Sequence, residues 1–254
     1  MRVAALYDIH GNLPALEAVL DDVRRERVDQ VVVGGDVFPG PMPGECLQYL
    51  LDLELPVRFI HGNGDRETLA AAAGGSSVHL PEPARAPIAW GAEQLEDRHR
   101  RIMEGWPPSL TLVVEGVGEV LFCHATPRND TEIFTRETPD ERLLGAFESA
   151  PGVVVCGHTH MQFDRSVGDR RVINAGSVGM PFGEPGAYWL LLGPDVALHH
   201  TDYDLVVAAD RVRASGYPQA DEFADGNVLS PPSAEQMLQA FEATAPVAGA
   251  ADDH

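Results

Sequence analysis

The sequence contains no lysine: all 18 basic residues among its 254 are arginine. This absence excludes a lysine Schiff base and a Walker-type phosphate-binding loop, because both require the lysine ammonium group. The 39 acidic residues outnumber the arginines, and the formal net charge is -21. Proteins bind long nucleic acids mainly through Lys and Arg contacts to phosphates, so we expect no long nucleic acid partner. A small anionic substrate stays compatible with this charge if bound cations reverse the local field.

Cysteine is scarce and long apolar runs are absent. The three cysteines, Cys46, Cys123 and Cys156, are an odd and widely spaced set without a CxxC motif. This pattern excludes a disulfide framework, and we interpret them as reduced thiols of a cytoplasmic protein. No apolar run approaches the roughly 18 residues of a membrane span, and the N-terminus enters a strand pattern without a signal-peptide hydrophobic region.

The first half of the chain alternates apolar strands with amphipathic helices. Strands are predicted at residues 3–7, 30–33 and 57–60, with helices at 13–25 and 43–53 between them. Parallel strands need crossover connections, which here are the helices. The βαβαβ order therefore predicts a parallel sheet covered by helices.

A small helical insert and a second β-rich run follow. The insert is predicted at about residues 66–118, with helices at 67–73 and 92–103. The hairpin-like spacing of the next strands predicts a second, largely antiparallel sheet. These strands are predicted at residues 110–114, 119–123, 153–156, 171–174, 187–192 and 197–201.

Residues 1–203 are predicted to form one domain, since 254 residues suffice for a single large core. Residues 204–254 are acidic and rich in Ala and Pro. We expect them to form a C-terminal extension with one or two helices, packing on the core or trailing from it. One of these helices is predicted at residues 234–244.

Five predicted strands are each followed, within a few residues, by side chains of the kind that bind metals. Ligands of open α/β sheets bind at the carboxyl ends of the strands. The donors are oxygen and nitrogen only, which suits Mn, Fe, Ni, Co or Zn and argues against a structural zinc site. Seven ligands exceed the need of one tetrahedral ion but suffice for two ions that share a carboxylate. The candidates are Asp8, His10, Asp36, Asn63, His124, His158 and His160.

Each candidate has a simpler explanation when it is taken alone. Asp8 can cap the helix that follows it, and Asp36 and Asn63 can be turn residues. A histidine after a strand is more often a hydrogen-bonded residue than a ligand. Accident does not readily explain five strands that all end in this way, so we interpret the set as metal ligands.

The candidate ligands lie in five motifs: DIHGN at 8–12, GGDV at 34–37, GNGD at 62–65, CHATP at 123–127 and GHTH at 157–160. In order and spacing these motifs resemble the calcineurin-like metallophosphoesterases over roughly residues 1–200. The resemblance implies an α/β (α+β) fold, a sandwich of two packed β-sheets flanked by helices, with a dinuclear site at one edge. It implies two ligand sets that share Asp36: Asp8, His10, Asp36 and His160, and Asp36, Asn63, His124 and His158.

The stretches TPRNDTEIF at 126–134 and INAGSVGMP at 173–181 are similar to the small bacterial phosphodiesterases and dinucleoside polyphosphate hydrolases of this family. The resemblance implies a phosphoesterase that acts on a small phosphorylated substrate through a metal-bridging hydroxide. The alternative is a metal-binding interaction module of the same fold with little or no turnover. Degenerate members of the family usually lose metal ligands, and all seven are present here, which favours the enzyme.

Several other residues are candidates for substrate binding and catalysis. Arg66 and Arg128 are expected to bind phosphate, since a guanidinium can hold it bidentately, and Asn63 is expected to assist. The alternative for Arg128 is a surface salt bridge with Asp130 or Glu132. The predicted catalytic residues are Asp36, Asn63, Asp65 and His124, with Asp65 orienting a ligand from behind.

The residue after the ligand Asn63 is Gly64, where the family pattern often has a histidine that protonates the leaving group. A positioned acid is typically worth about 10² to 10⁴ in rate. We therefore expect a preference for leaving groups that depart without local proton donation, such as those of aryl phosphodiesters or phosphoanhydrides. His61 is a possible substitute donor, but its geometry is not apparent from the sequence.

Overall fold

Two β-sheets of five strands each form the centre of the molecule in the part of the chain that the computed structural model describes, residues 1–244. The first sheet has the order β10-β9-β1-β2-β3. Strands β1, β2 and β3 are parallel neighbours, as the βαβαβ pattern predicts. The bounds of these strands are Val3–Leu6 for β1, Gln30–Val33 for β2, Val57–Phe59 for β3, Ala187–Leu192 for β9 and Val196–Thr201 for β10.

The second sheet has the order β4-β5-β6-β8-β7 and is mixed, which corrects the prediction of a largely antiparallel sheet. Strand β6 is parallel to β5, because a long connection carrying the helix Asp140–Phe147 returns the chain between them. It is also parallel to β8, because the chain runs back along β7, on the far side of β8, before it enters β8. Strands β9 and β10, which were predicted in this sheet, instead pair antiparallel on the edge of β1. The bounds are Ser109–Val114 for β4, Gly118–Cys123 for β5, Val153–Cys156 for β6, Phe163–Val167 for β7 and Arg170–Asn174 for β8.

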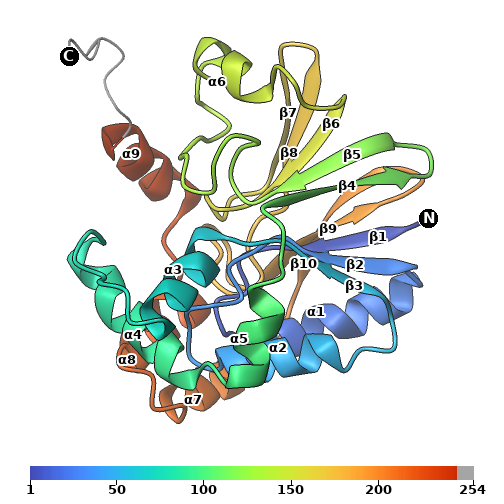
Figure 1. Cartoon of the computed structure of the whole chain (residues 1–254). Coiled ribbons are helices and arrows are strands. Elements are labelled where there is room, and N and C mark those ends of the chain that lie inside the picture. Colours follow the sequence, from blue (N-terminus) through green and yellow to red (C-terminus); the bar gives the residue numbers. More distant parts are fainter. Residues whose placement is uncertain (245–254) are drawn as a thin grey trace, which may run out of the picture.

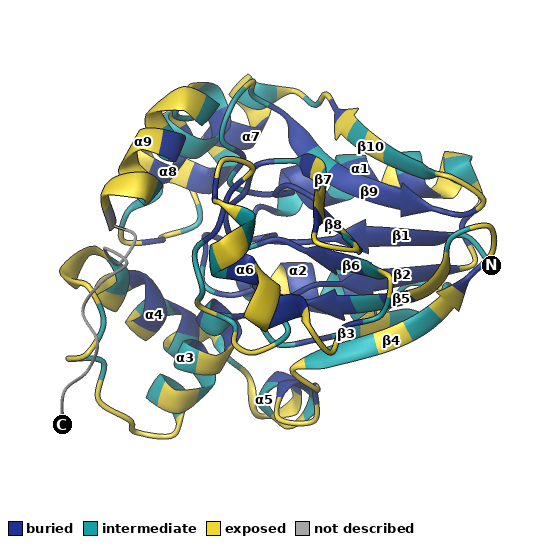
Figure 2. Ribbon diagram, turned by 90° about the horizontal axis from the view of Figure 1, so that it is seen from above, coloured by how far each residue is buried: buried dark blue, intermediate teal, exposed yellow. Residues whose placement is uncertain are grey.

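The two sheets pack face to face with an apolar core between them, which confirms the predicted sandwich (Figure 1). Val3, Ala5 and Leu190 of the first sheet meet Phe122 and Val155 of the second, and all five are buried. Figure 2 shows β1 and β2 in the dark blue of buried residues, whereas the edge strand β4 is mostly of intermediate burial, with Thr111 and Val113 exposed. The carboxyl ends of β1 and β2 are therefore fixed on rigid, fully buried strands.

Helices α1 (Leu13–Glu26) and α2 (Pro43–Leu51) cover the outer face of the first sheet, and α6 (Asp140–Phe147) covers that of the second. The Asn12 side chain caps α1 by accepting a hydrogen bond from Ala15 N at 3.2 Å. The apolar stripe of α1 packs on the sheet, as its periodicity predicts. The loops between β1, β2 and their helices are therefore held at one end of the sheet.

Three helices lie between β3 and β4: α3 (Asn63–Ala72), α4 (Glu82–Gln94) and α5 (Asp97–Met103). The predicted single helix at 92–103 is wrong, because α4 ends before Leu95, whose backbone is extended, and α5 starts after it. The missed start of α4 lies among prolines, which fit the first turn of a helix as well as a loop. Strand β4 also falls within the range predicted for the insert.

The segment after β10 contains α7 (Leu205–Arg213), α8 (Ala220–Phe223), a π-helical stretch η1 (Ala224–Leu229) and α9 (Ala234–Thr244). The first three were missed in the sequence, and they pack through Ala208, Val212 and Phe223 against Met42 and the start of α1. The predicted helix at 234–244 coincides with α9, while residues 245–254 of the predicted extension lie outside the described residues. None of the helices described combines the length and apolar character needed to cross a bilayer.

Candidate metal centre and substrate pocket

The seven candidate ligands follow the carboxyl ends of β1, β2, β3, β5 and β6, with Asn63 as the first residue of α3, and the structure brings them together. Nε2 of His160 is 3.4 Å from Asp8 Oδ1, and Nε2 of His124 is 3.5 Å from Asp36 Oδ2. Ligating atoms of Asp8, His10 and His160 lie within 4.8 Å of one another, as do those of Asp8, Asp36 and His124. Segments that are far apart in the sequence thus form one cluster at the end of the two sheets where these strands terminate.

The backbone of these turns is strained at the candidate ligands themselves. Six non-glycine residues of the described chain have a left-handed backbone, and five of them are candidate ligands. This conformation costs an L-residue about 1–2 kcal/mol, and such strain persists mainly at functional sites. The five φ angles are 52° at Asp8, 45° at His10, 55° at Asp36, 66° at His158 and 57° at His160. No pattern in the sequence predicted this left-handed backbone at the candidate ligands.

Three of the imidazoles are held by backbone carbonyl oxygens at Nδ1. A carbonyl oxygen only accepts hydrogen bonds, so Nδ1 carries the hydrogen and Nε2 of the neutral ring is left with a bare lone pair. Metal-binding histidines are commonly oriented in this way. The carbonyls are those of Pro39 for His10 at 3.3 Å, Gly34 for His124 at 2.9 Å and Met180 for His160 at 2.7 Å.

The bare lone pairs point at one another and at carboxylate oxygens. Nε2 of His10 lies 3.3 Å from Nε2 of His160, and both lie within 4 Å of Asp8 Oδ1. This oxygen is buried and has no hydrogen-bond partner within residues 1–244. Electron-rich atoms at these distances repel one another unless positive charge lies between them. The residues therefore fit a divalent cation.

Asp36 lies between the two groups of rings. Its Oδ2 is 3.7 Å from Nε2 of His10 and 3.5 Å from Nε2 of His124. Its other oxygen, Oδ1, accepts a hydrogen bond from Gly64 N at 2.7 Å. In the same way Asp8 Oδ2 accepts from His158 N at 2.8 Å, which leaves Oδ1 for the rings. Each carboxylate thus has one oxygen fixed by the backbone and one directed at imidazoles.

Asn63 and His158 complete the cluster on the side of His124. The side-chain amide of Asn63 has one terminal atom, here called the outer atom, that faces the two rings, and it is either the oxygen or the nitrogen. This atom lies 3.1 Å from His124 Nε2 and 3.0 Å from His158 Nδ1. With nitrogen in that place the amide donates to both rings and to the backbone oxygen of Asp130, and with oxygen in that place the amide oxygen faces three other acceptor atoms. Burial lowers the pKa of His158 to about 4, so this ring is neutral. A cation between these atoms would select the orientation with oxygen outward.

The pKa values follow from burial opposed by these contacts. Burial raises the pKa of the Asp8 and Asp36 carboxyls, but the imidazoles of His160 and His124 outweigh it and hold both below their usual range. Burial lowers the pKa of His124, yet the carboxylates of Asp36 and Asp8 outweigh it and raise that pKa to about 10. A proton and a metal ion compete for the same ring nitrogen, so the cluster attracts positive charge.

Glycines leave room for the carboxylates. A Cβ at Gly62 would lie 2.1 Å from Asp36 Oδ1, and one at Gly157 would lie 2.4 Å from Asp8 Oδ2. At Gly64 a Cβ would lie 2.4 Å from Phe38 O and 3.1 Å from Asp36 Oδ1. Position 64 therefore has no room for the proton-donating histidine of the family pattern.

Asp65, predicted as a catalytic residue that orients a ligand, lies behind the cluster. Its carboxylate accepts hydrogen bonds from the backbone N–H of Asp36 at 2.7 Å, Phe38 at 3.0 Å and Gly62 at 3.1 Å. Burial and the Asp36 carboxylate raise the pKa of Asp65 to about 7, against the effect of these N–H donors. The residue contacts the turn that carries Asp36.

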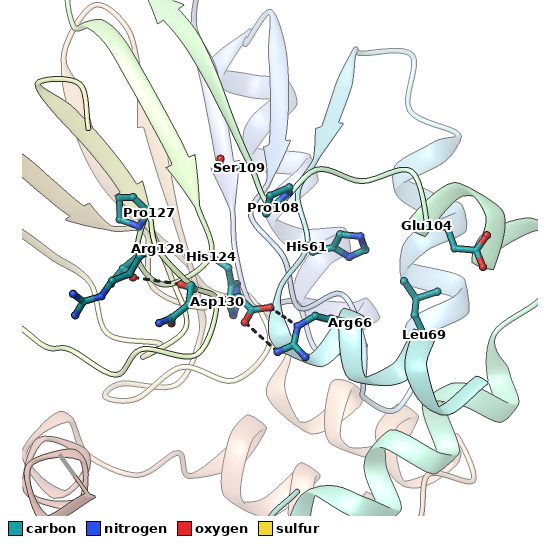
Figure 3. A pocket seen from close by; sticks show the side chains of 12 residues that line it. His61, Arg66, Leu69, Glu104, Pro108, Ser109, His124, Pro127, Arg128 and Asp130 are labelled. Carbon is teal, nitrogen blue, oxygen red and sulfur yellow. Dashed lines mark hydrogen bonds and ion pairs between the residues drawn. The ribbon is translucent and has the colours of Figure 1, made fainter. Parts of the chain in front are cut away.

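A cavity of about 560 Å³ adjoins the cluster at His124 (Figure 3). His61 lies in its wall beside Trp106, with ring centroids 5.7 Å apart, and its Nδ1 is buried without a partner within residues 1–244. The lining residues are His61, Arg66, Leu69, Glu104, Pro108, Ser109, His124, Thr126, Pro127, Arg128, Asn129 and Asp130.

Both arginines predicted to bind phosphate line this cavity, and both are already paired with carboxylates. Arg128 forms a two-pronged ion pair with Glu132, which is the alternative considered for it from the sequence. Arg66 forms one with Asp130, through Nε at 2.8 Å and Nη2 at 3.0 Å. Sequence analysis did not identify this second pair, because its partners lie on different elements.

Residues 1–193 match the calcineurin-like phosphoesterase superfamily domain. The uncharacterized protein MJ0912 of Methanocaldococcus jannaschii is 24% identical over 237 residues, which cover 85% of this chain and 94% of that protein. The crystal structure of the hypothetical protein PH1004 from Pyrococcus horikoshii OT3 has a TM-score of 0.76 at 20% identity, covering 91% of this chain and 99% of that chain. A metallophosphoesterase from Sphaerobacter thermophilus has a TM-score of 0.69 at 26% identity, covering 90% and 100%.

Proposed function

Because the chain belongs to the calcineurin-like phosphoesterase superfamily, we propose that it hydrolyses phosphodiesters or small nucleotides with two bound divalent metal ions. The observation that carries this proposal is the convergence of bare ring nitrogens on carboxylate oxygens, around the unpartnered Oδ1 of Asp8 within residues 1–244. A donor set of nitrogen and oxygen suits Mn, Fe, Ni, Co or Zn. The family resemblance and the contacts of these residues support the same site.

Each proposed ion has its own set of ligands, and Asp36 is shared. One set is Asp8, His10, Asp36 and His160, and the other is Asp36, Asn63, His124 and His158. Divalent ions in these sets would supply positive charge to the phosphoryl oxygens and lower the pKa of water for its attack on phosphorus. The chain itself fixes one oxygen of each carboxylate with a backbone N–H and fixes three rings with carbonyls. The ligands are thus oriented before substrate binds.

The rest of the substrate is proposed to lie in the cavity beside His124. Its volume of about 560 Å³ accommodates a nucleoside or an aryl group. The net charge of -21 argues against long nucleic acid as a substrate. With no side chain at Gly64, leaving groups that depart without proton donation are favoured. The free, buried thiols of all three cysteines support a cytoplasmic location.

A metal and substrate panel tests this proposal. Protein stripped of metal is reloaded separately with Mn, Ni, Co, Zn or Mg and assayed on a bis-aryl phosphate, nucleoside monophosphates, cyclic nucleotides and dinucleoside polyphosphates. We expect metal-dependent hydrolysis that His158→Ala abolishes and His200→Ala preserves, since the His200 ring bonds to Pro185 O. Metal binding without turnover of any substrate would contradict the proposal and leave a metal-binding interaction module.

A further inference from the structure

The ion pair of Arg66 and Asp130 joins the two walls of the cavity. Arg66 lies on α3, which follows the first sheet, and Asp130 lies in the loop after β5 of the second sheet (Figure 3). Nε and Nη2 of Arg66 donate to the two oxygens of Asp130 at 2.8 and 3.0 Å. Nη1 donates to Glu67 Oε1 at 2.5 Å. Every nitrogen of this guanidinium therefore faces a carboxylate.

This pair lies directly beside the candidate metal centre. The backbone oxygen of Asp130 is 3.2 Å from the outer amide atom of Asn63, and His124 lines the same cavity. The side chains of Arg66 and Asp130 are 47% and 24% exposed, so solutes in the cavity can reach them. A second phosphate of a substrate bound at His124 would lie next to Asp130.

The arginines of the cavity carry no uncompensated positive charge in the described chain. Arg66 is balanced by Asp130 and Glu67, and Arg128 is balanced by Glu132. The N–H edge of Arg66 that would hold phosphate bidentately is the edge that holds Asp130. An additional anionic phosphate would have to displace one of these carboxylates or lie beside it. A phosphate and a carboxylate that lie side by side repel each other, because both are negatively charged.

We propose that Asp130 is a specificity-determining residue, which occupies Arg66 and so selects substrates whose second group is uncharged. The substrate class is then a phosphodiester with a nucleoside or aryl group in the cavity, and polyphosphates are disfavoured. This inference rests on the proposed function of the same site. The opposite role, in which Asp130 holds Arg66 in place to receive phosphate, predicts the opposite effect of removing the carboxylate.

Asp130→Asn keeps the shape of the side chain and removes its charge. In metal-loaded protein, the measured quantity is kcat/KM for a dinucleoside polyphosphate divided by kcat/KM for a bis-aryl phosphate. We expect Asp130→Asn to raise this ratio at least about tenfold, mainly through a lower KM for the polyphosphate, because Arg66 gains a free edge. Adding Arg66→Ala should cancel the gain, and Asp130→Glu should keep the wild-type ratio.

Asp164→Asn is the matched control, because Asp164 also holds an arginine by two hydrogen bonds, from Arg171 at 2.9 and 2.6 Å, and neither residue lines the cavity. It removes one negative charge and frees an arginine away from the substrate, so it should leave the ratio within about twofold. An unchanged or lower ratio in Asp130→Asn overturns the inference, as does an equal gain in Asp164→Asn.

Calorimetric binding of inorganic pyrophosphate to metal-loaded protein, freed of unbound metal, gives a second readout that needs no turnover. Asp130→Asn should bind pyrophosphate about tenfold more tightly than wild type, and Asp130→Asn with Arg66→Ala should not. If wild type hydrolyses no substrate, the proposed function fails while this comparison still tests the role of Asp130. Equal pyrophosphate affinity in wild type and Asp130→Asn counts against that role.

Discussion

Asp65 holds the turn that carries Asp36. The carboxylate of Asp65 accepts a hydrogen bond from the backbone N–H of Asp36 at 2.7 Å and is fully buried. Since Asp36 has a left-handed backbone with φ of 55°, this bond opposes relaxation of the turn to an ordinary conformation. The position of the candidate bridging carboxylate thus depends on a second carboxylate that points away from the rings.

Asp65→Asn should therefore lower both stability and metal content. An amide at this position offers one acceptor oxygen to three backbone N–H groups and turns its own NH₂ toward donors. Leaving buried donors unpaired costs about 1–3 kcal/mol each, and we expect a loss of that order in the free energy of unfolding. Urea unfolding and metal analysis measure the two effects. Asp202→Asn, at a side chain that is 94% exposed, should change neither.

Asp36→Asn should reduce the metal content below two ions per chain and abolish turnover. The variant keeps an acceptor for Gly64 N but replaces the charged oxygen that faces His10 and His124 with a weaker ligand. Asp164→Asn, which loses an ion pair between the exposed residues Asp164 and Arg171, is the control. Metal analysis combined with an assay decides the matter, and an Asp36→Asn protein with full activity would contradict the shared-ligand role.

The candidate ligands could be identified in the sequence, whereas most of the backbone contacts that orient their side chains could not. Asp8, Asp36 and His124 each follow an apolar strand, and such strands end at one edge of a sheet whatever the rest of the fold. The carbonyl oxygens of Pro39 and Met180, which orient the His10 and His160 rings, are backbone atoms. Every residue has such an oxygen, so the sequence does not show which of them meet a ring. The left-handed backbone at the ligands also depends on tertiary contacts.

Pairings between distant segments were the other limit. The run Ala187–Leu192 is apolar enough to lie in either sheet, and only its register with β1 decides the matter. Arg66 pairs with Asp130, 64 residues away, although Asp130 had been considered as a partner for its sequence neighbour Arg128. Local patterns predict strands and turns, but the partner across a cavity depends on how the two sheets pack.

Metal removal should destabilise the folded protein measurably. Bare ring nitrogens and carboxylates at 3.3–3.9 Å from one another would be stabilised by cations that bind only the folded state. Ligand at 100 times its dissociation constant stabilises a protein by about 2.7 kcal/mol, so Mn or Zn should raise the unfolding temperature and a chelator should reverse the gain. Thermal unfolding measures this shift. His10→Ala with His160→Ala should shrink it, and an undiminished shift in that variant would place the ions elsewhere.

Phe182→Ala should weaken metal binding although it changes none of the candidate ligands. The Phe182 ring stacks on the His160 ring with centroids 5.0 Å apart, and its centroid is 6.1 Å from that of Phe241 in α9. Phe182 therefore links the C-terminal helix to the cluster. Loss of a supporting contact behind a ligand typically lowers metal affinity about 10- to 100-fold, and we expect the lower end of that range. Phe182→Tyr keeps the stack and should retain wild-type affinity in a metal titration. Equal affinities for wild type and Phe182→Ala would show that His160 needs no such support.

Gly64→Ala should damage both the fold and the site, because the new Cβ would lie 2.4 Å from Phe38 O and crowd the Asp36 carboxylate at 3.1 Å. Overpacking of this kind costs about 1–3 kcal/mol, and here the groups displaced are backbone and a candidate ligand. The expected result is a lower free energy of unfolding together with reduced metal content. Gly145→Ala is the matched control: Gly145 lies in α6 with nothing within 4 Å of the new Cβ, so the variant should gain roughly 0.4–1 kcal/mol. A Gly64→Ala protein that matches wild type in stability and metal content would show that position 64 has room for a side chain. Gly64→His would then be a reasonable variant with which to introduce the proton donor of the family pattern.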